Sequence, residues 1–337
     1  MKILYLTDAQ PDYLSDDLLY GLRSLLGSEV VDYPRKDVLY RTSPLKPAAQ
    51  RLYGRGFHCF GLDDVPIDRT DIASKIGGRH FDFIINSNAW RIQCPFHPRL
   101  VIIDGEDHGR LMPRYAGKLA LYFKRELYAP QPGVESILFA LPDFLYDDRV
   151  LPRTKRYHAS FGPTSTVRQQ LAATYPPQYS FLTWQDYVGD IKQSWFAISP
   201  KGAGYDCQRH YEILGQAVLC IFMDEGAPPL LRKCFRDGHN CLTFSNAEEL
   251  RGKMDQCADP GRLIEQARED LLSTHLASRR VEQLVSVMVS KTLVSGKPGW
   301  LNRLEWYSWV VRATARHGHF RGNGEMARAL RSRRILP

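Results

Sequence analysis

Residues whose types and spacing could do chemistry are concentrated in residues 198–224, ISPKGAGYDCQRHYEILGQAVLCIFMD. A strand is predicted to end at Ser199, and a loop with two glycines follows it. Gly202 and Gly204 allow a backbone to approach a ligand closely. A helix predicted to begin near Asp206 would offer free N–H groups to a phosphate. The segment therefore favours phosphate binding at the carboxyl end of a strand.

Charged side chains in the same segment suit a nucleoside diphosphate. Lys201 and Arg209 carry the positive charge that a diphosphate needs. Arg209 and Glu212 are three positions apart, so a helix places them on one face, where the glutamate can accept both hydroxyls of a ribose. The alternative is an ordinary strand–loop–helix turn, in which Asp206 caps the helix and Arg209 forms a surface ion pair with Glu212.

The same run resembles the donor-site signature of GT-B glycosyltransferases, and is closest to bacterial cell-surface glycan transferases and exostosin-like transferases. The shared features are a Ser-Pro-(Lys/Arg)-Gly-x-Gly loop, an Arg-x-x-Glu helix and an apolar strand. Downstream, LRKCFRDGHNCLTFSNAEEL resembles the Asp-Gly-x-Asn-x-Leu-x-Phe segment of these enzymes, and STHLASRR resembles their terminal His-Thr-x-x-Arg helix without its Thr. Upstream, LYGRGFHCFGLDD, IIDGEDHG and YFKREL are similar to their N-terminal-lobe segments. The resemblance covers most of residues 1–290.

The resemblance implies an α/β protein with two Rossmann-like doubly wound domains that face a cleft. It implies a nucleotide sugar as substrate, a glycan or lipid-linked acceptor in cell-surface polysaccharide biosynthesis, and no metal or other cofactor. The residues expected to bind the donor are Lys201, Gly202, Gly204, Asp206, Arg209 and Glu212. Retaining enzymes of the largest group carry two glutamates eight positions apart. Here Gly204 occupies the earlier position, which favours inversion of the sugar.

An inverting transferase needs a group that removes a proton from the acceptor hydroxyl. The predicted strand Leu100–Ile103 is followed by Asp-Gly-Glu-Asp-His, the densest titratable cluster in the first half. Crowding of like charges can raise the pKa of one carboxylate into a useful range. Asp107 and Glu106 are the preferred bases, and Asp8, after the first predicted strand, is their rival. A solvated acidic loop is the alternative.

Two further cations follow another predicted strand. Lys124 and Arg125 could reach the diphosphate when the two lobes close, or could form a basic pair on the surface. Lys, Arg and helix N-termini suffice to stabilise a leaving diphosphate, so no metal is required.

Strand-like and helix-like segments alternate through both halves of the chain, which indicates parallel, doubly wound sheets. The polar segment Tyr146–Lys155 is the predicted linker. We therefore expect an acceptor-binding domain over residues 1–150 and a nucleotide-sugar-binding domain over residues 151–290. Among the predicted strands are residues 136–141 and 179–182.

Composition narrows the function classes. The chain has 337 residues, seven cysteines without a CxxC pair, and a net charge of +8. The cysteine pattern argues against zinc and disulfides and favours a reducing, cytoplasmic compartment. The basic residues are scattered and carry no nucleic-acid-binding signature, so no nucleic acid is expected. No Gly-x-Gly-x-x-Gly follows the first strand, which excludes a standard dehydrogenase fingerprint. A sugar-nucleotide epimerase of the same fold and a non-catalytic binding protein remain as alternatives.

The tail, residues 291–337, changes in composition. Residues 298–311 carry three tryptophans, and seven arginines follow between 312 and 334. Aromatic residues beside a basic run are typical of an interfacial membrane anchor. A C-terminal helix that packs on the N-terminal domain is the alternative. No stretch approaches the ~18 apolar residues of a membrane span. We therefore expect peripheral docking on the anionic inner membrane face.

Overall fold

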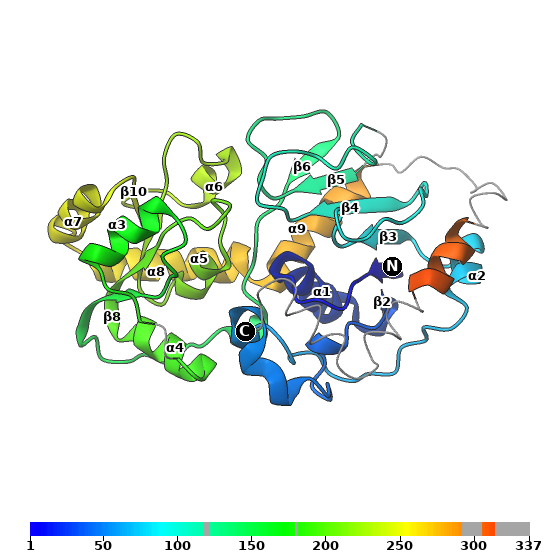
Figure 1. The fold of residues 1–337 in the computed structure, drawn as a ribbon, viewed down its shortest axis with the longest axis horizontal. Coiled ribbons are helices and arrows are strands. Elements are labelled where there is room, and N and C mark those ends of the chain that lie inside the picture. The colour runs from blue at the N-terminus through cyan, green and yellow to red at the C-terminus, as the bar shows by residue number, and fades with distance from the viewer. Residues whose placement is uncertain (118–120, 179–180, 292–304, 314–337) are drawn as a thin grey trace.

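The computed structural model describes residues 1–117, 121–178, 181–291 and 305–313. Two lobes lie side by side, and each is built on a parallel sheet (Figure 1). The N-terminal lobe has the strand order β2-β1-β3-β4-β5-β6, and the C-terminal lobe has the order β10-β9-β8-β7. The arrangement confirms the expected pair of doubly wound domains.

The first sheet consists of β1 (Ile3–Leu6), β2 (Val30–Tyr33), β3 (Phe83–Asn86), β4 (Leu100–Asp104), β5 (Leu121–Lys124) and β6 (Val134–Ser136). The second consists of β7 (Lys155–Ala159), β8 (Ser194–Ser199), β9 (Val218–Phe222) and β10 (Leu242–Phe244). Along β1, Ile3 and Tyr5 enter one buried cluster while Leu4 and Leu6 enter another. Both faces of this strand are therefore covered, as its unbroken apolar sequence indicates.

The helices are α1 (Tyr13–Leu26), α2 (Ile72–Gly77), α3 (Thr166–Thr174), α4 (Trp184–Lys192), α5 (Gln208–Ile213), α6 (Pro229–Cys234), α7 (Ala247–Gln256), α8 (Pro260–Asp270) and α9 (Ala277–Ser290). Helix α1 begins after Asp12, whose side chain accepts the Ser15 N–H, and ends at Gly27, where φ is 56°. This cap fixes Tyr13, the first residue of α1, at the edge of the interlobe space.

The chain crosses between the lobes twice, and the two crossings are bonded to each other. Leu141 donates its N–H to the His275 carbonyl at 2.9 Å and accepts the Ala277 N–H at 2.8 Å. The second crossing leads into α9, which packs against α1 of the N-terminal lobe. Both crossings therefore tie the C-terminal lobe to the first one.

One predicted strand, residues 136–141, is wrong. Strand β6 ends at Ser136, and although Ile137 still donates its N–H to the Lys124 carbonyl of β5, the residues after it bond to other elements. Phe139 donates its N–H to Asp206, and Leu141 bonds to His275. The apolar run is needed to cross between the lobes, which its periodicity does not reveal. In the other predicted strand, residues 181–182 are not in a strand, and residues 179–180 lie outside the described residues.

The described part of the tail packs on the N-terminal lobe. A helix over residues 305–313 buries Trp306 and Trp309 in the cluster that contains Leu4 and Ile102. Trp306 donates its indole N–H to the Phe96 carbonyl at 3.2 Å. Tyr307 and Val311 are exposed. Residues 298–304 and 314–337, which carry the rest of the predicted anchor, lie outside the described residues. No helix among the described residues is long and apolar enough to cross a membrane.

Close packing of α9 on α1 leads to a stability prediction. A Cβ at Gly21 would lie 2.2 Å from the Ala277 carbonyl oxygen and 2.7 Å from Cγ2 of Val281. We expect Gly21→Ala to lower the free energy of unfolding by ~1–3 kcal/mol, because the two helices must separate. The matched control is Gly252→Ala in α7, where a Cβ meets no atom within 4 Å. Thermal melts that show equal or higher stability for Gly21→Ala would contradict this packing.

Candidate functional site

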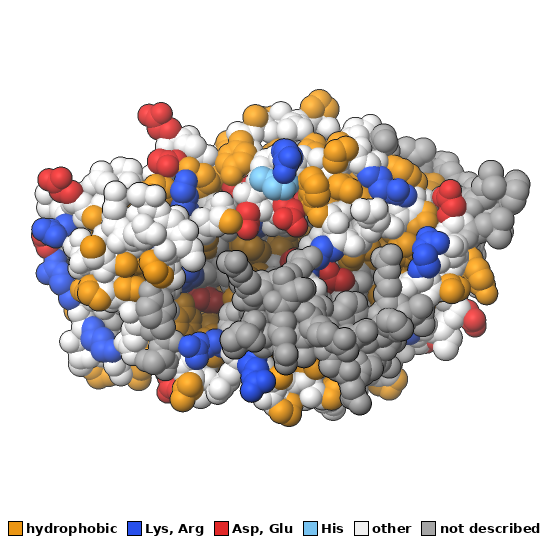
Figure 2. All heavy atoms as spheres, viewed as in Figure 1, with side chains coloured by type: hydrophobic (Ala, Val, Ile, Leu, Met, Phe, Trp, Pro, Cys, Tyr) orange, Lys and Arg blue, Asp and Glu red, His pale blue; other side chains and the backbone are white. Residues whose placement is uncertain are grey.

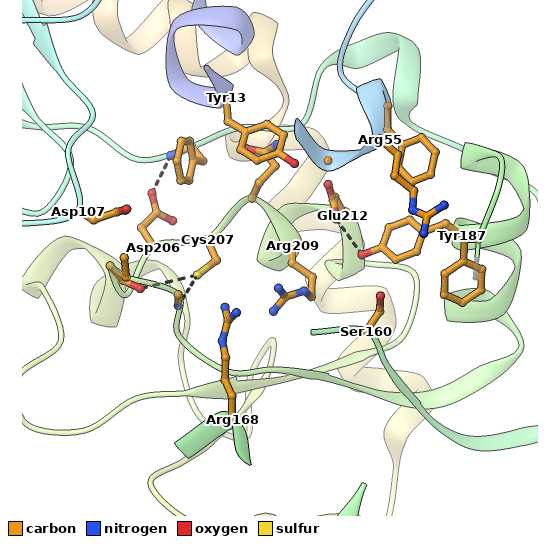
Figure 3. Close-up of a pocket in the computed structure, with 18 residues that line it drawn as sticks. Tyr13, Arg55, Asp107, Ser160, Arg168, Tyr187, Asp206, Cys207, Arg209 and Glu212 are labelled. Carbon is orange, nitrogen blue, oxygen red and sulfur yellow. Dashed lines mark hydrogen bonds between the residues drawn. The ribbon is translucent and has the colours of Figure 1, made fainter. Parts of the chain in front are cut away.

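A cavity of about 350 Å³ lies between the lobes. Figure 3 shows side chains from both lobes around it: Tyr13 and Arg55 enter from the N-terminal lobe, and Arg168, Arg209 and Glu212 from the C-terminal lobe. The C-terminal contributors lie at or beyond the carboxyl ends of β7 and β8. Ligands of open parallel sheets bind at this edge.

The loop after β8 depends on its glycines. Gly202 donates its N–H to the Gly204 carbonyl at 2.9 Å, and the Cys207 sulfur lies 3.1 Å from the same nitrogen. A Cβ at Gly204 would lie 2.4 Å from Oε1 of Glu126 and 3.0 Å from Oδ1 of Asp107, both on the N-terminal lobe. Position 204 therefore has no room for a side chain, because the other lobe fills that space.

The predicted helix start is displaced. Helix α5 begins at Gln208, after Cys207, and not at Asp206. Asp206 accepts the Phe139 N–H at 2.9 Å and the Tyr211 hydroxyl at 2.8 Å, so its carboxylate is buried in a link between the lobes. Burial raises the pKa of Asp206 to about 6, although Arg125 opposes the change.

Two guanidinium groups from the C-terminal lobe meet at the cavity. Figure 3 shows Arg168 of α3 and Arg209 of α5 pointing toward each other. Arg168 donates to the Lys201 carbonyl at 2.8 Å. Arg209 lies 3.4 Å from the Pro200 carbonyl oxygen, and no described carboxylate forms an ion pair with it. Two like charges at one cavity wall favour an anionic ligand between them.

Glu212 lines the same cavity with both carboxylate oxygens already in hydrogen bonds. Oε1 lies 3.0 Å from Nε2 of His58, and Oε2 accepts the Tyr187 hydroxyl at 2.8 Å. Burial raises the pKa of Glu212, but the contacts with His58 and Tyr187 and the charge of Arg209 together outweigh burial and lower it. A carboxylate has about four acceptor positions, so two remain for a ligand.

Asp107 is the predicted base that reaches the cavity. Its side chain is 54% exposed and forms an ion pair with the buried Arg125. Arg125 also donates to the carbonyl of Asp206 and to Glu126, so it joins the two lobes. Asp107 thus lies beside Gly204, at the point where the loop after β4 meets the loop after β8.

The structure places the other predicted site residues outside the cavity lining. Lys124 is fully buried and pairs with Asp104 at 2.7 Å. The Lys201 ammonium lies over the Tyr205 ring, 4.3 Å from its centroid. Glu106 lies on the same loop as Asp107 but does not line the cavity. Asp8 pairs with Arg91 at 3.2 Å. Gly202, Gly204, Asp206, Arg209, Glu212 and Asp107 all line the cavity.

Several lining residues were not predicted from the sequence. They are Tyr13, Arg55, Phe57, Arg168 and Tyr187. The signal for Arg55 and Phe57 was present in LYGRGFHCF, where an Arg between two glycines precedes aromatic residues. Such a loop can carry a charged side chain to a ligand, but its place opposite α5 depends on how the lobes meet.

No protein-family model matches the chain, and no curated protein matches it in sequence. Solved structures do resemble it. A glycosyltransferase from Rickettsia africae is 9% identical with a TM-score of 0.52, over 87% of this chain and 99% of that one. The Anabaena protein HepE, in a complex with UDP-glucose, is 9% identical with a TM-score of 0.50, over 86% of this chain and 100% of that one. These likenesses establish the fold, the two-lobed GT-B architecture.

Proposed function

We propose that this protein is a glycosyltransferase that moves a sugar from a nucleoside diphosphate sugar to a hydroxyl acceptor. One observation carries the proposal: Arg168, Arg209 and Glu212 converge on one interlobe cavity at the carboxyl ends of the C-terminal strands. Positive charge beside a carboxylate suits a diphosphate attached to a ribose. The UDP-glucose complex of HepE, which shares the fold, is consistent with this ligand class.

Each part of the substrate has a proposed partner. Arg209 and Arg168 bind the diphosphate and stabilise the charge that develops as it leaves. Glu212 accepts hydrogen bonds from the ribose hydroxyls. Asp107, across from them, removes the proton of the acceptor hydroxyl. Because the arginines supply the compensating charge, we propose that the reaction needs no metal. We propose that it inverts the sugar, because Gly204 stands where retaining enzymes of the largest group carry the earlier of their two glutamates.

The proposed acceptor is a glycan or lipid-linked glycan of the cell surface, reached from the cytoplasmic side. Figure 2 shows Lys and Arg side chains scattered over the face in view and not gathered into a stripe. That distribution fits a small anionic donor better than an extended nucleic acid.

A panel of nucleotide sugars tests the proposed function. A bound donor should raise the melting temperature of the protein, because a ligand that binds only the native state stabilises it. The same donor, incubated without acceptor, should show only slow hydrolysis. Full turnover without acceptor would identify the epimerase alternative, and binding without any turnover on a glycan panel would identify a non-catalytic binding protein. No shift with any nucleotide sugar or nucleoside diphosphate would contradict the proposal.

We also propose peripheral docking on an anionic membrane. Tyr307 and Val311 are exposed on the 305–313 helix, and the arginines of the tail follow it. Each Arg near an anionic leaflet contributes ~1 kcal/mol, so a few suffice for reversible binding. The full chain should float with anionic vesicles at low salt, and a chain that ends at Gly318 should float less. Equal recovery with neutral and anionic vesicles would contradict docking through charge.

A further inference from the structure

The N-terminal lobe reaches into the proposed ribose site through His58. This residue is 3% exposed, and each ring nitrogen faces a carboxylate. Nε2 lies 3.0 Å from Glu212 of the C-terminal lobe, and Nδ1 lies 3.4 Å from Asp17 of α1. Asp17 in turn accepts the Ala140 N–H at 3.2 Å. A buried chain of three titratable groups therefore runs from one lobe to the other.

The loop that carries His58 is shaped for this contact. Gly54, Arg55 and Gly56 all have positive φ values, between 56° and 69°. A Cβ at Gly54 would lie 1.9 Å from the Tyr13 hydroxyl, so the turn fits only a glycine there. Phe57 then stacks on Tyr187 of α4, with ring centroids 5.8 Å apart. The loop is thus seated on the C-terminal lobe at Phe57, next to the His58–Glu212 contact.

The two carboxylates favour the charged form of His58. Burial lowers the pKa of His58, but its hydrogen bonds to Asp17 and Glu212 and the charges of these two groups outweigh burial and raise that pKa to about 9. An imidazolium can donate to both carboxylates at once, from Nε2 to Glu212 and from Nδ1 to Asp17. The positive charge of His58 compensates the negative charge of Glu212. Among the described residues, the ion-pair partner of Glu212 is His58 and not Arg209. Arg209 is therefore left to bind an anion.

We propose that His58 is a positioning residue that orients Glu212 for the ribose hydroxyls, so that the ribose site is completed by the other lobe. The inference rests on the proposed function. His58 and Tyr187 hold one oxygen of Glu212 each and fix the direction of its remaining lone pairs. Without His58, the carboxylate is free to turn toward Arg209, three residues away on the same helix.

A ribose-discrimination ratio tests this role. UDP, GDP, ADP and CDP are screened first, and the tightest binder is compared with its 2′,3′-dideoxy analogue by calorimetry. Wild-type protein should bind the ribonucleotide ~10-fold or more tightly than the analogue, because the two hydroxyls donate to a charged acceptor. In His58→Gln the ratio should fall to about 3-fold or less. A loss of affinity that is equal for the ribonucleotide and its analogue cancels in the ratio. A general loss of folded protein therefore leaves the ratio unchanged.

Two controls separate positioning from other effects. His97→Gln replaces another buried histidine, beside Trp306 and away from the cavity, and should keep the wild-type ratio. Together with His58→Gln, the single variant Glu212→Gln and the double variant His58→Gln/Glu212→Gln complete a double-mutant cycle. If His58 acts through Glu212, the double variant loses no more discrimination than Glu212→Gln alone. Additive losses would overturn the proposal.

A second variant serves if His58→Gln does not fold. Asp17→Asn changes the far partner of His58 without touching a residue of the cavity lining, and should lower the ratio part of the way. A wild-type ratio in whichever of these variants folds overturns the positioning role alone. If the wild-type protein binds none of the four diphosphates, that result instead contradicts the proposed function, and the inference with it.

Discussion

Replacing Asp107 by Asn is expected to lower kcat by ~10²-fold or more while donor affinity stays near that of the wild type. Asn keeps the size of the side chain but cannot accept a proton from the acceptor hydroxyl. Asp107 is the predicted base that lines the cavity, and half of its side chain is exposed to it and to solvent. Initial rates with saturating donor, beside calorimetry of donor binding, give the two quantities.

The matched control is Glu106→Gln, one position away on the same loop but outside the cavity lining. It should retain turnover. Asp107→Asn also weakens the ion pair with Arg125, which contacts Asp206, so a drop in donor affinity would point to a structural role. Normal turnover in Asp107→Asn together with a loss in Asp8→Asn would move the base to the loop after β1.

Donor affinity should fall ~10- to 150-fold in Arg209→Ala, which corresponds to ~1.5–3 kcal/mol for a charged hydrogen bond to a phosphate. Among the described residues, the hydrogen bonds of Arg209 are long, at 3.4 Å to Pro200 and 3.5 Å to Ser199, so we expect the fold not to depend on them. The melting temperature of the unliganded variant should therefore stay close to that of the wild type.

Arg156→Ala is the matched control, because Arg156 is an exposed arginine of the same lobe that pairs with Asp255 outside the cavity. It should leave donor affinity unchanged. Calorimetric titration with the bound nucleoside diphosphate measures both variants. Unchanged donor affinity in Arg209→Ala would contradict binding of the diphosphate by Arg209.

The C-terminal part of the cavity lining could be predicted because its residues are close in sequence. Gly202, Gly204, Arg209 and Glu212 lie within one strand–loop–helix unit, and local chemistry brings them together. The N-terminal half could not be predicted in the same way. His58 and Glu212 are 154 positions apart, and their contact depends on the angle at which two lobes meet.

Lys124 shows why residue type and position after a strand are insufficient. It is the last residue of β5, at the end of the strand where a ligand-binding cation would lie, but the register of the sheet pairs Asp104 of β4 directly with Lys124. The acid and the base then neutralise each other in the interior, where an isolated charge is costly. Such register cannot be inferred from either segment alone. The strand predicted over residues 136–141 failed for a related reason, since its backbone partners belong to other elements.

The paired crossings at Leu141 and Leu276 restrict how the halves of the molecule can move. Two covalent connections that exchange backbone hydrogen bonds behave as a double-stranded hinge, which bends across its width more readily than it shears or twists. Any movement of the two lobes apart would therefore turn them about this hinge. The contact between His58 and Glu212 lies close to this hinge, because Asp17, which His58 also contacts, accepts the Ala140 N–H beside Leu141. A turn about the hinge would therefore displace this contact less than contacts farther from it.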